Sequence, residues 1–162
     1  MTFSSKAWRW SAIALRVALG GVFVYAAWVK LRLPWQLFAG AIEDYKLVPA
    51  WSVIPLARSL PWAELLIGLL LVSGRWLRTA SAACSLLLAV FFALMVRAFA
   101  KGMEISCGCF GPGETISWFT LLRDGSLLVA SLGVTWMAFA RRRRGERAAS
   151  ATAERPSAVG SA

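Results

Sequence analysis

Four long apolar stretches dominate the sequence, and each is long enough to cross a lipid bilayer. They cover residues 11–29, 51–73, 76–99 and 117–140, whereas a membrane-spanning helix needs roughly 20 mainly apolar residues. A spanning segment must satisfy its backbone hydrogen bonds internally, which single long apolar runs achieve as helices. We therefore predict an all-α integral membrane protein whose residues 1–140 form a four-helix bundle.

The charged residues fit this prediction by their position. The chain is 59% hydrophobic and 16% charged, with a formal net charge of +10. Four arginines, Arg141 to Arg144, follow directly on the last apolar stretch. A nucleic-acid-binding face would instead spread its basic residues over a folded surface, so we predict a lipid bilayer and no nucleic acid as partner. Residues 141–162 are expected to form a polybasic, disordered cytoplasmic tail.

Basic residues also indicate the orientation of the spans. Four spans place both termini on one side, together with the turn at Gly74 and Arg75; this side carries ten basic residues, whereas the two remaining loops carry five. The positive-inside rule then predicts cytoplasmic termini in a bacterial inner membrane, with the loops 30–50 and 101–116 facing the periplasm. Arg16 interrupts the first apolar stretch, which favours a retained span over a cleaved signal peptide.

The first outer loop has a helical pattern of its own. Pro34 can begin a helix, and Trp35, Phe38 and Ile42 follow at helical spacing. We predict a short amphipathic element that lies along the membrane interface.

Two cysteines one glycine apart, Cys107 and Cys109, are the sharpest candidate for chemistry. They lie in the second outer loop, in a turn-rich sequence that continues with Phe110 and Gly111. A disulfide between them would close a small, strained ring, and strained disulfides exchange readily. The pair could instead be chance neighbours, a static disulfide or a soft-metal ligand set. The third cysteine, Cys84, lies within a span and is expected to serve packing only.

Charged residues inside the spans are the second candidate site, because they are costly in lipid. Glu64 could simply pair with Arg16 or Arg123 and lock the bundle. Alternatively, four residues could line a polar pocket that holds a quinone head group or passes protons, namely Glu64, Arg97, Arg123 and Asp124. A quinone could accept the electrons and protons of dithiol oxidation; no other cofactor and no metal site are predicted, since the chain has no histidine.

These residues resemble those of the DoxX-like membrane proteins and, among them, the MauE group of methylamine utilization proteins. The matching segments are 16–30, 45–49, 61–68 with Glu64, Cys107 to Gly111, and Arg123 with Asp124. The segment Cys-Gly-Cys-Phe-Gly is the most specific of them. The resemblance covers almost the whole chain except the tail.

The resemblance implies a four-helix membrane protein associated with redox chemistry. It further implies a helper in the maturation of the disulfide-rich beta subunit of periplasmic methylamine dehydrogenase, alongside a periplasmic thioredoxin-like partner. By the same resemblance, Cys107 and Cys109 would be the exchanging pair, with Glu64, Arg16 and Arg123 as structural or pocket residues.

Our interpretation is a membrane protein that exchanges thiol and disulfide electrons through Cys107 and Cys109. It would be a thiol-disulfide oxidoreductase or the membrane electron-transfer partner of one. Three alternatives stay open: a non-catalytic assembly or docking factor, a soft-metal carrier, and a quinone-linked membrane subunit of an oxidoreductase.

Overall fold

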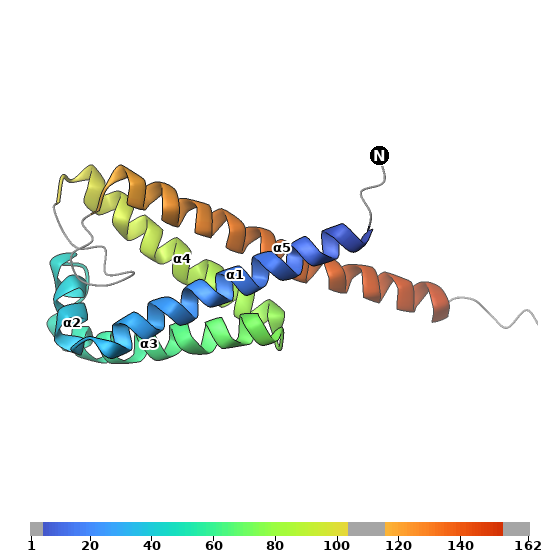
Figure 1. Cartoon of the computed structure of the whole chain (residues 1–162), viewed down its shortest axis with the longest axis horizontal. Coiled ribbons are helices and arrows are strands. Elements are labelled where there is room, and N and C mark those ends of the chain that lie inside the picture. Colours follow the sequence, from blue (N-terminus) through green and yellow to red (C-terminus); the bar gives the residue numbers. More distant parts are fainter. Residues whose placement is uncertain (1–4, 104–115, 154–162) are drawn as a thin grey trace, which may run out of the picture.

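The computed structural model describes residues 5–103 and 116–153, and within these ranges the protein is entirely helical (Figure 1). Five helices follow one another along the chain: α1 Ser5–Arg32, α2 Trp35–Asp44, α3 Ala50–Ser73, α4 Leu77–Ala100 and α5 Trp118–Ala153. The all-α prediction is confirmed. The segment 30–50, predicted as the first outer loop, contains a helix, α2, at the predicted amphipathic element.

Three of these helices are long and apolar enough to cross a membrane: α1 over Trp10–Arg32, α3 and α4. The predicted fourth span, residues 117–140, lies in α5, which does not reach the same apolarity in the part of the chain that the structure describes. Arg123 and Asp124 in its second turn contribute to this lower hydropathy. The fourth crossing, and with it the four-helix membrane bundle, therefore stays a prediction.

Helix α5 continues through the four arginines to Ala153, where the sequence suggested a disordered tail. The reason lies in local propensity, because alanine, arginine and glutamate dominate this region and all three favour helix. Residues 154–162 lie outside the described part of the chain.

The helices pack as two antiparallel pairs, α1 with α3 and α4 with α5 (Figure 1). The pairs meet through contacts of α3 with α4 and of α1 with α5, and α2 packs on the beginning of α3. At this packing surface Ala39 of α2 meets Val53 and Ala57 of α3. The end of α1, α2, the end of α4 and the beginning of α5 consequently share one end of the bundle (Figure 1).

Two glycines bring α1 and α3 into close backbone contact. A Cβ atom built on Gly20 would lie 2.9 Å from the carbonyl oxygen of Gly68, and a Cβ atom on Gly68 would lie 2.9 Å from the carbonyl oxygen of Gly20. Real Cβ atoms do not approach an oxygen so closely, so both positions need glycine. Small residues let helices approach in this way inside membranes. This contact fixes the register of α1 along α3.

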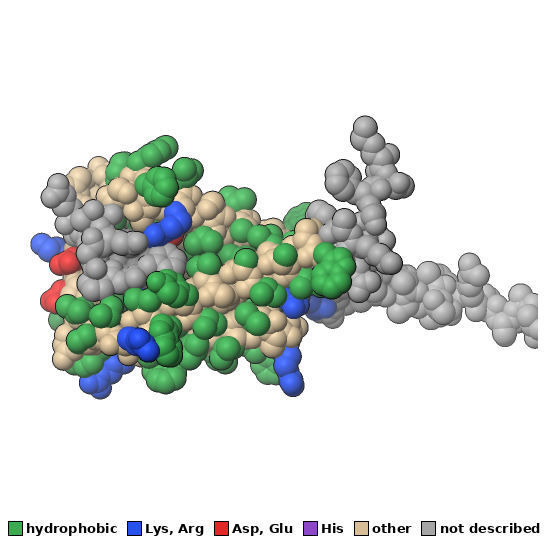
Figure 2. Space-filling view, in the orientation of Figure 1, with side chains coloured by type: hydrophobic (Ala, Val, Ile, Leu, Met, Phe, Trp, Pro, Cys, Tyr) green, Lys and Arg blue, Asp and Glu red, His purple; other side chains and the backbone are tan. Residues whose placement is uncertain are grey.

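The surface of the bundle is apolar, as lipid contact requires. Large hydrophobic side chains such as Val129, Leu86 and Trp136 are 68–78% exposed, and green hydrophobic side chains cover much of the face in Figure 2. Inside, α4 and α5 are joined by a hydrogen bond of 2.9 Å between the hydroxyls of Ser85 and Thr135. These two hydroxyls thus satisfy each other inside the bundle, while many large apolar side chains face outward.

Candidate functional site

A buried ion pair joins the last turn of α1 to the middle of α3. The ammonium Nζ of Lys30 lies 2.5 Å from Oε1 of Glu64, and the two side chains are only 3% and 5% exposed. The ring centroids of Phe38 and Phe91 lie 5.0 and 5.5 Å from the same ammonium. A cation at this distance is attracted by the ring faces. Lys30 is therefore held by one carboxylate and two aromatic rings from α2 and α4.

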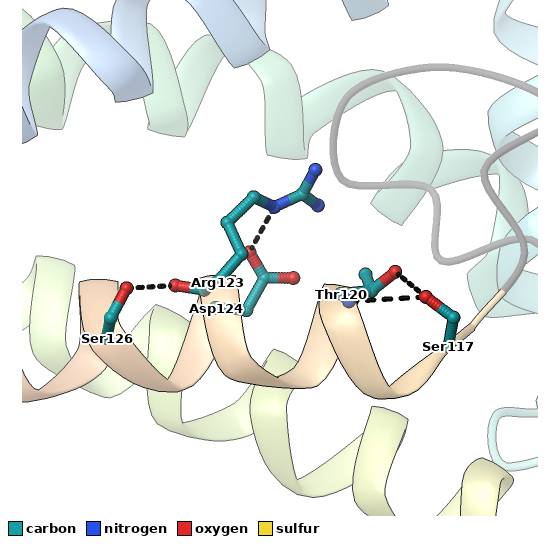
Figure 3. Close-up of polar contacts among 5 residues, drawn as sticks. All are labelled: Ser117, Thr120, Arg123, Asp124 and Ser126. Carbon is teal, nitrogen blue, oxygen red and sulfur yellow. Dashed lines mark hydrogen bonds and ion pairs between the residues drawn. The ribbon is translucent and has the colours of Figure 1, made fainter.

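A second acidic residue, Asp124, is buried in the second turn of α5 with 4% exposure. The guanidinium Nε of Arg123 donates a hydrogen bond of 3.2 Å to its Oδ1, and Figure 3 shows this contact. The side chain of Arg123 is 33% exposed, so it links the buried carboxylate to the outside of the helix pair. Ser117, Thr120 and Ser126 add small hydrogen-bonding groups on neighbouring turns of α5 (Figure 3).

The two acidic side chains and Lys30 line one cavity between the helix pairs. Its remaining walls are apolar and come mainly from α1 and α4, with Phe91 and Phe92 among them. The cavity has a volume of about 40 Å³, which is enough for a few water molecules.

The carboxylate of Glu64 is only half satisfied within this cavity. Its Oε1 is paired with Lys30, but its Oε2 is buried and accepts no hydrogen bond from the described residues. A buried carboxylate oxygen is costly to leave unpaired, so it calls for water or another donor in the cavity. Chemically, the cavity offers two carboxylates that can carry protons and one ammonium that can donate hydrogen bonds.

The four pocket residues predicted from the sequence separate into two groups. Glu64 and Asp124 line the common cavity, and Arg123 reaches it through its contact with Asp124. Arg97 is exposed near the end of α4 and is not among the lining residues.

The expected partner of Glu64 was wrong, because Lys30 takes the place suggested for Arg16 or Arg123. The register set by Gly20 and Gly68 explains this. It brings Lys30 alongside Glu64, whereas Arg16 lies one helical turn before Gly20 and reaches Val72 near the end of α3.

Lys30 is the residue of the candidate site that the sequence reasoning missed, since its position suggested a loop flank. A signal was nevertheless present. The buried face of α1 contains Leu19, Phe23, Ala26 and Ala27 at helical spacing, and Lys30 follows on the same face. A lysine on the buried face of a helix needs an oppositely charged partner inside the protein, and its position on this face therefore indicated one.

Cys107 and Cys109 lie outside the described residues. The helices that flank their segment, α4 ending at Ala100 and α5 beginning at Trp118, have these ends at the end of the bundle where α2 lies (Figure 1). Cys84 is a free thiol with 1% exposure in the core, packed with Phe23 and Leu71. This agrees with the packing role predicted for it.

Long apolar helices and internal ion pairs define a small helical membrane protein. The family model described as methylamine utilisation protein MauE matches residues 8–137, and the chain belongs to this family.

Curated relatives agree with this assignment. The chain is similar to methylamine utilization protein MauE of Methylorubrum extorquens, with 33% identity over 115 residues, covering 69% of this chain and 61% of the relative. The corresponding protein of Methylophilus methylotrophus is 38% identical over 126 residues, covering 75% and 64%. The chain thus spans somewhat less than two thirds of the length of these relatives. No solved structure matches it.

Proposed function

We propose that this protein exchanges thiol and disulfide electrons through Cys107 and Cys109 with a periplasmic thioredoxin-like protein or client. The context would be methylamine utilization, with the beta subunit of methylamine dehydrogenase as the maturing client. Family membership supports the context, because the relatives are named for methylamine utilization. The observation that carries the chemistry is the Cys-Gly-Cys sequence between two packed helices, α4 and α5.

The exchange step balances without an external oxidant. The thiolate of one cysteine attacks the partner's disulfide and forms a mixed disulfide, and one partner sulfur leaves as a thiolate. The second cysteine then attacks the mixed disulfide, which forms the Cys107–Cys109 bond and releases the partner as a dithiol. In the opposite direction, a client dithiol is oxidised and Cys107 and Cys109 are reduced.

Continued client oxidation needs a second electron acceptor, and the proposed class is a membrane quinone. The side chains offer suitable contacts, since Lys30 can donate to a carbonyl and Phe91 offers a ring face, but the cavity has room for only a few water molecules and would have to widen to admit a quinone ring. A bound quinone would accept the two electrons. Glu64 and Asp124 would carry the two protons that accompany them.

The proposed topology has α5 as a fourth span and both termini in the cytoplasm of a bacterial inner membrane. Its antiparallel packing along α4 supports the crossing, because α5 then leads back across the same layer. Arg75 and Arg78 at the turn between α3 and α4 support a cytoplasmic location of that end. The Cys107–Cys109 segment would then face the periplasm, where disulfides form.

The test is complementation of a methylamine-utilizing bacterium that lacks its own MauE. We expect Cys107→Ser and Cys109→Ser each to abolish disulfide maturation of the dehydrogenase beta subunit while the protein remains in the membrane at normal levels. Cys84→Ala is the matched control, because this thiol is buried in the core, and it should retain function.

Normal maturation with both serine variants would refute thiol exchange and favour a non-catalytic docking factor. Stoichiometric soft-metal binding that is lost in both variants would favour a metal carrier instead.

A further inference from the structure

Three arginines gather at the end of the bundle opposite α2, around the turn between α3 and α4. Arg16 comes from α1, Arg75 from the turn, and Arg78 from the first turn of α4. The guanidinium of Arg16 lies against Gly74 and donates from Nη2 to the carbonyl oxygen of Val72 at 3.4 Å. None of the three is in an ion pair with the described residues. On the visible face in Figure 2, the acidic side chains lie at the α2 end.

Arg16 also lines a cavity between α1, α4 and α5. The other lining residues are all apolar: Ala12, Ile13, Leu77, Val134, Met137 and Ala138. The cavity has a volume of about 20 Å³. Nε of Arg16 is buried and donates no hydrogen bond to the described residues. The site thus combines a guanidinium that is only partly hydrogen-bonded with apolar walls.

The three arginines are not explained by a hydrogen bond from Arg16 to the C-terminal end of α3 alone. Arg16 does contact the last turn of α3, where a cation is favourable near the free carbonyls. However, the contact is long at 3.4 Å and uses one nitrogen of the guanidinium. Arg75 and Arg78 take no part in it. The positive charge that remains calls for an anion.

We infer that this arginine cluster binds the phosphate of an anionic phospholipid. Guanidinium groups bind phosphate through paired, charge-assisted hydrogen bonds. Basic pockets between membrane helices on the cytoplasmic side are suited to anionic head groups. Exposed apolar side chains beside the cluster, such as Trp76 and Trp136, would contact the acyl chains, which a free phosphate would not need. This inference rests on the proposed topology, which puts this end of the bundle on the cytoplasmic side, but not on the proposed thiol exchange.

The experiment measures thermal unfolding of the full-length protein in detergent during titration with phosphatidylglycerol, phosphatidylcholine or inorganic phosphate. We expect saturable stabilisation by phosphatidylglycerol alone. Arg78→Gln should weaken its apparent affinity about fivefold, and Arg16→Gln by at least as much. Arg58→Gln is the matched control, because Arg58 is exposed near the α2 end and lies over the ring of Trp35, and it should leave the affinity unchanged.

Equal stabilisation by phosphatidylcholine, or equal affinities in all variants, would overturn the inference. Stabilisation by inorganic phosphate alone would show a small-anion site, and the lipid assignment would be wrong. If Arg16→Gln fails to fold, Arg75→Gln and Arg78→Gln still decide the question, because neither side chain makes a hydrogen bond or ion pair with the described residues.

Discussion

Removing either partner of the Lys30–Glu64 ion pair should destabilise the bundle far more than removing both. The pair lies at 2.5 Å, and each side chain is at least 95% shielded from solvent. A buried charge that loses its partner typically costs about 3–5 kcal/mol, whereas an apolar pair of similar volume is often neutral. We therefore expect Lys30→Met and Glu64→Leu each to lower the free energy of unfolding by about 3 kcal/mol, near the lower limit.

We expect a loss near the lower end of this range because each charge, when its partner is removed, has a way to avoid remaining buried and unpaired. Lys30 belongs to the last turn of α1, so its long side chain can move towards the membrane interface when Glu64 is removed. Glu64, in the middle of α3, can take up a proton and become neutral when Lys30 is removed. The double variant should return to within about 1 kcal/mol of the natural protein.

The assay is reversible unfolding in mixed micelles, followed by helical circular dichroism, for the natural protein, both single variants and the double variant. The coupling between the two positions is obtained from this double-mutant cycle. Single losses below about 1 kcal/mol that simply add in the double variant would refute the argument, because the two residues would then act independently.

Two further predictions concern packing and topology. Gly20→Ala should destabilise the protein by about 1–3 kcal/mol in the same unfolding assay, since the new methyl group would lie 2.9 Å from a backbone oxygen of α3. Gly21→Ala, with nothing within 4 Å, should be neutral or stabilising, and equal effects would contradict the close contact. In a Cys84→Ala background, a membrane-impermeant maleimide should label Cys107 and Cys109 in intact cells only after mild reduction. Failure to label after reduction in intact cells, with labelling in permeabilised cells, would contradict the periplasmic location.

The buried ion pair connects two helices, and it also lies in the cavity where we propose proton transfer. Lys30 and Glu64 connect α1 to α3 and so help to hold the first helix pair. The same carboxylate leaves Oε2 unpaired in a cavity that Asp124 of the second pair also lines. Replacing the ion pair by apolar residues is therefore expected to preserve the fold and remove the carboxylate that we propose to carry protons. Stability and maturation activity, measured on the double variant, separate the two roles.

The sequence by itself determined the helices and their chemical character. The predicted spans 51–73 and 76–99 coincide within a residue with α3 and α4, because long apolar runs bounded by polar or glycine residues have few other structures available. The amphipathic spacing after Pro34 likewise predicted α2. Cys-Gly-Cys could be recognised without coordinates, since its chemistry depends on local spacing.

Only the tertiary structure decided which charges meet. Apolar periodicity does not specify how far one helix slides along another, and a shift of one turn moves a side chain by about 5.4 Å. Here the contact of Gly20 with Gly68 sets that position. As a result Glu64 pairs with Lys30 and not with Arg16. The rotation of α4 likewise leaves Arg97 exposed, while the packing of the two helix pairs brings Asp124 to the cavity. Side-chain partners between distant segments depend on this packing, because it alone fixes both register and rotation.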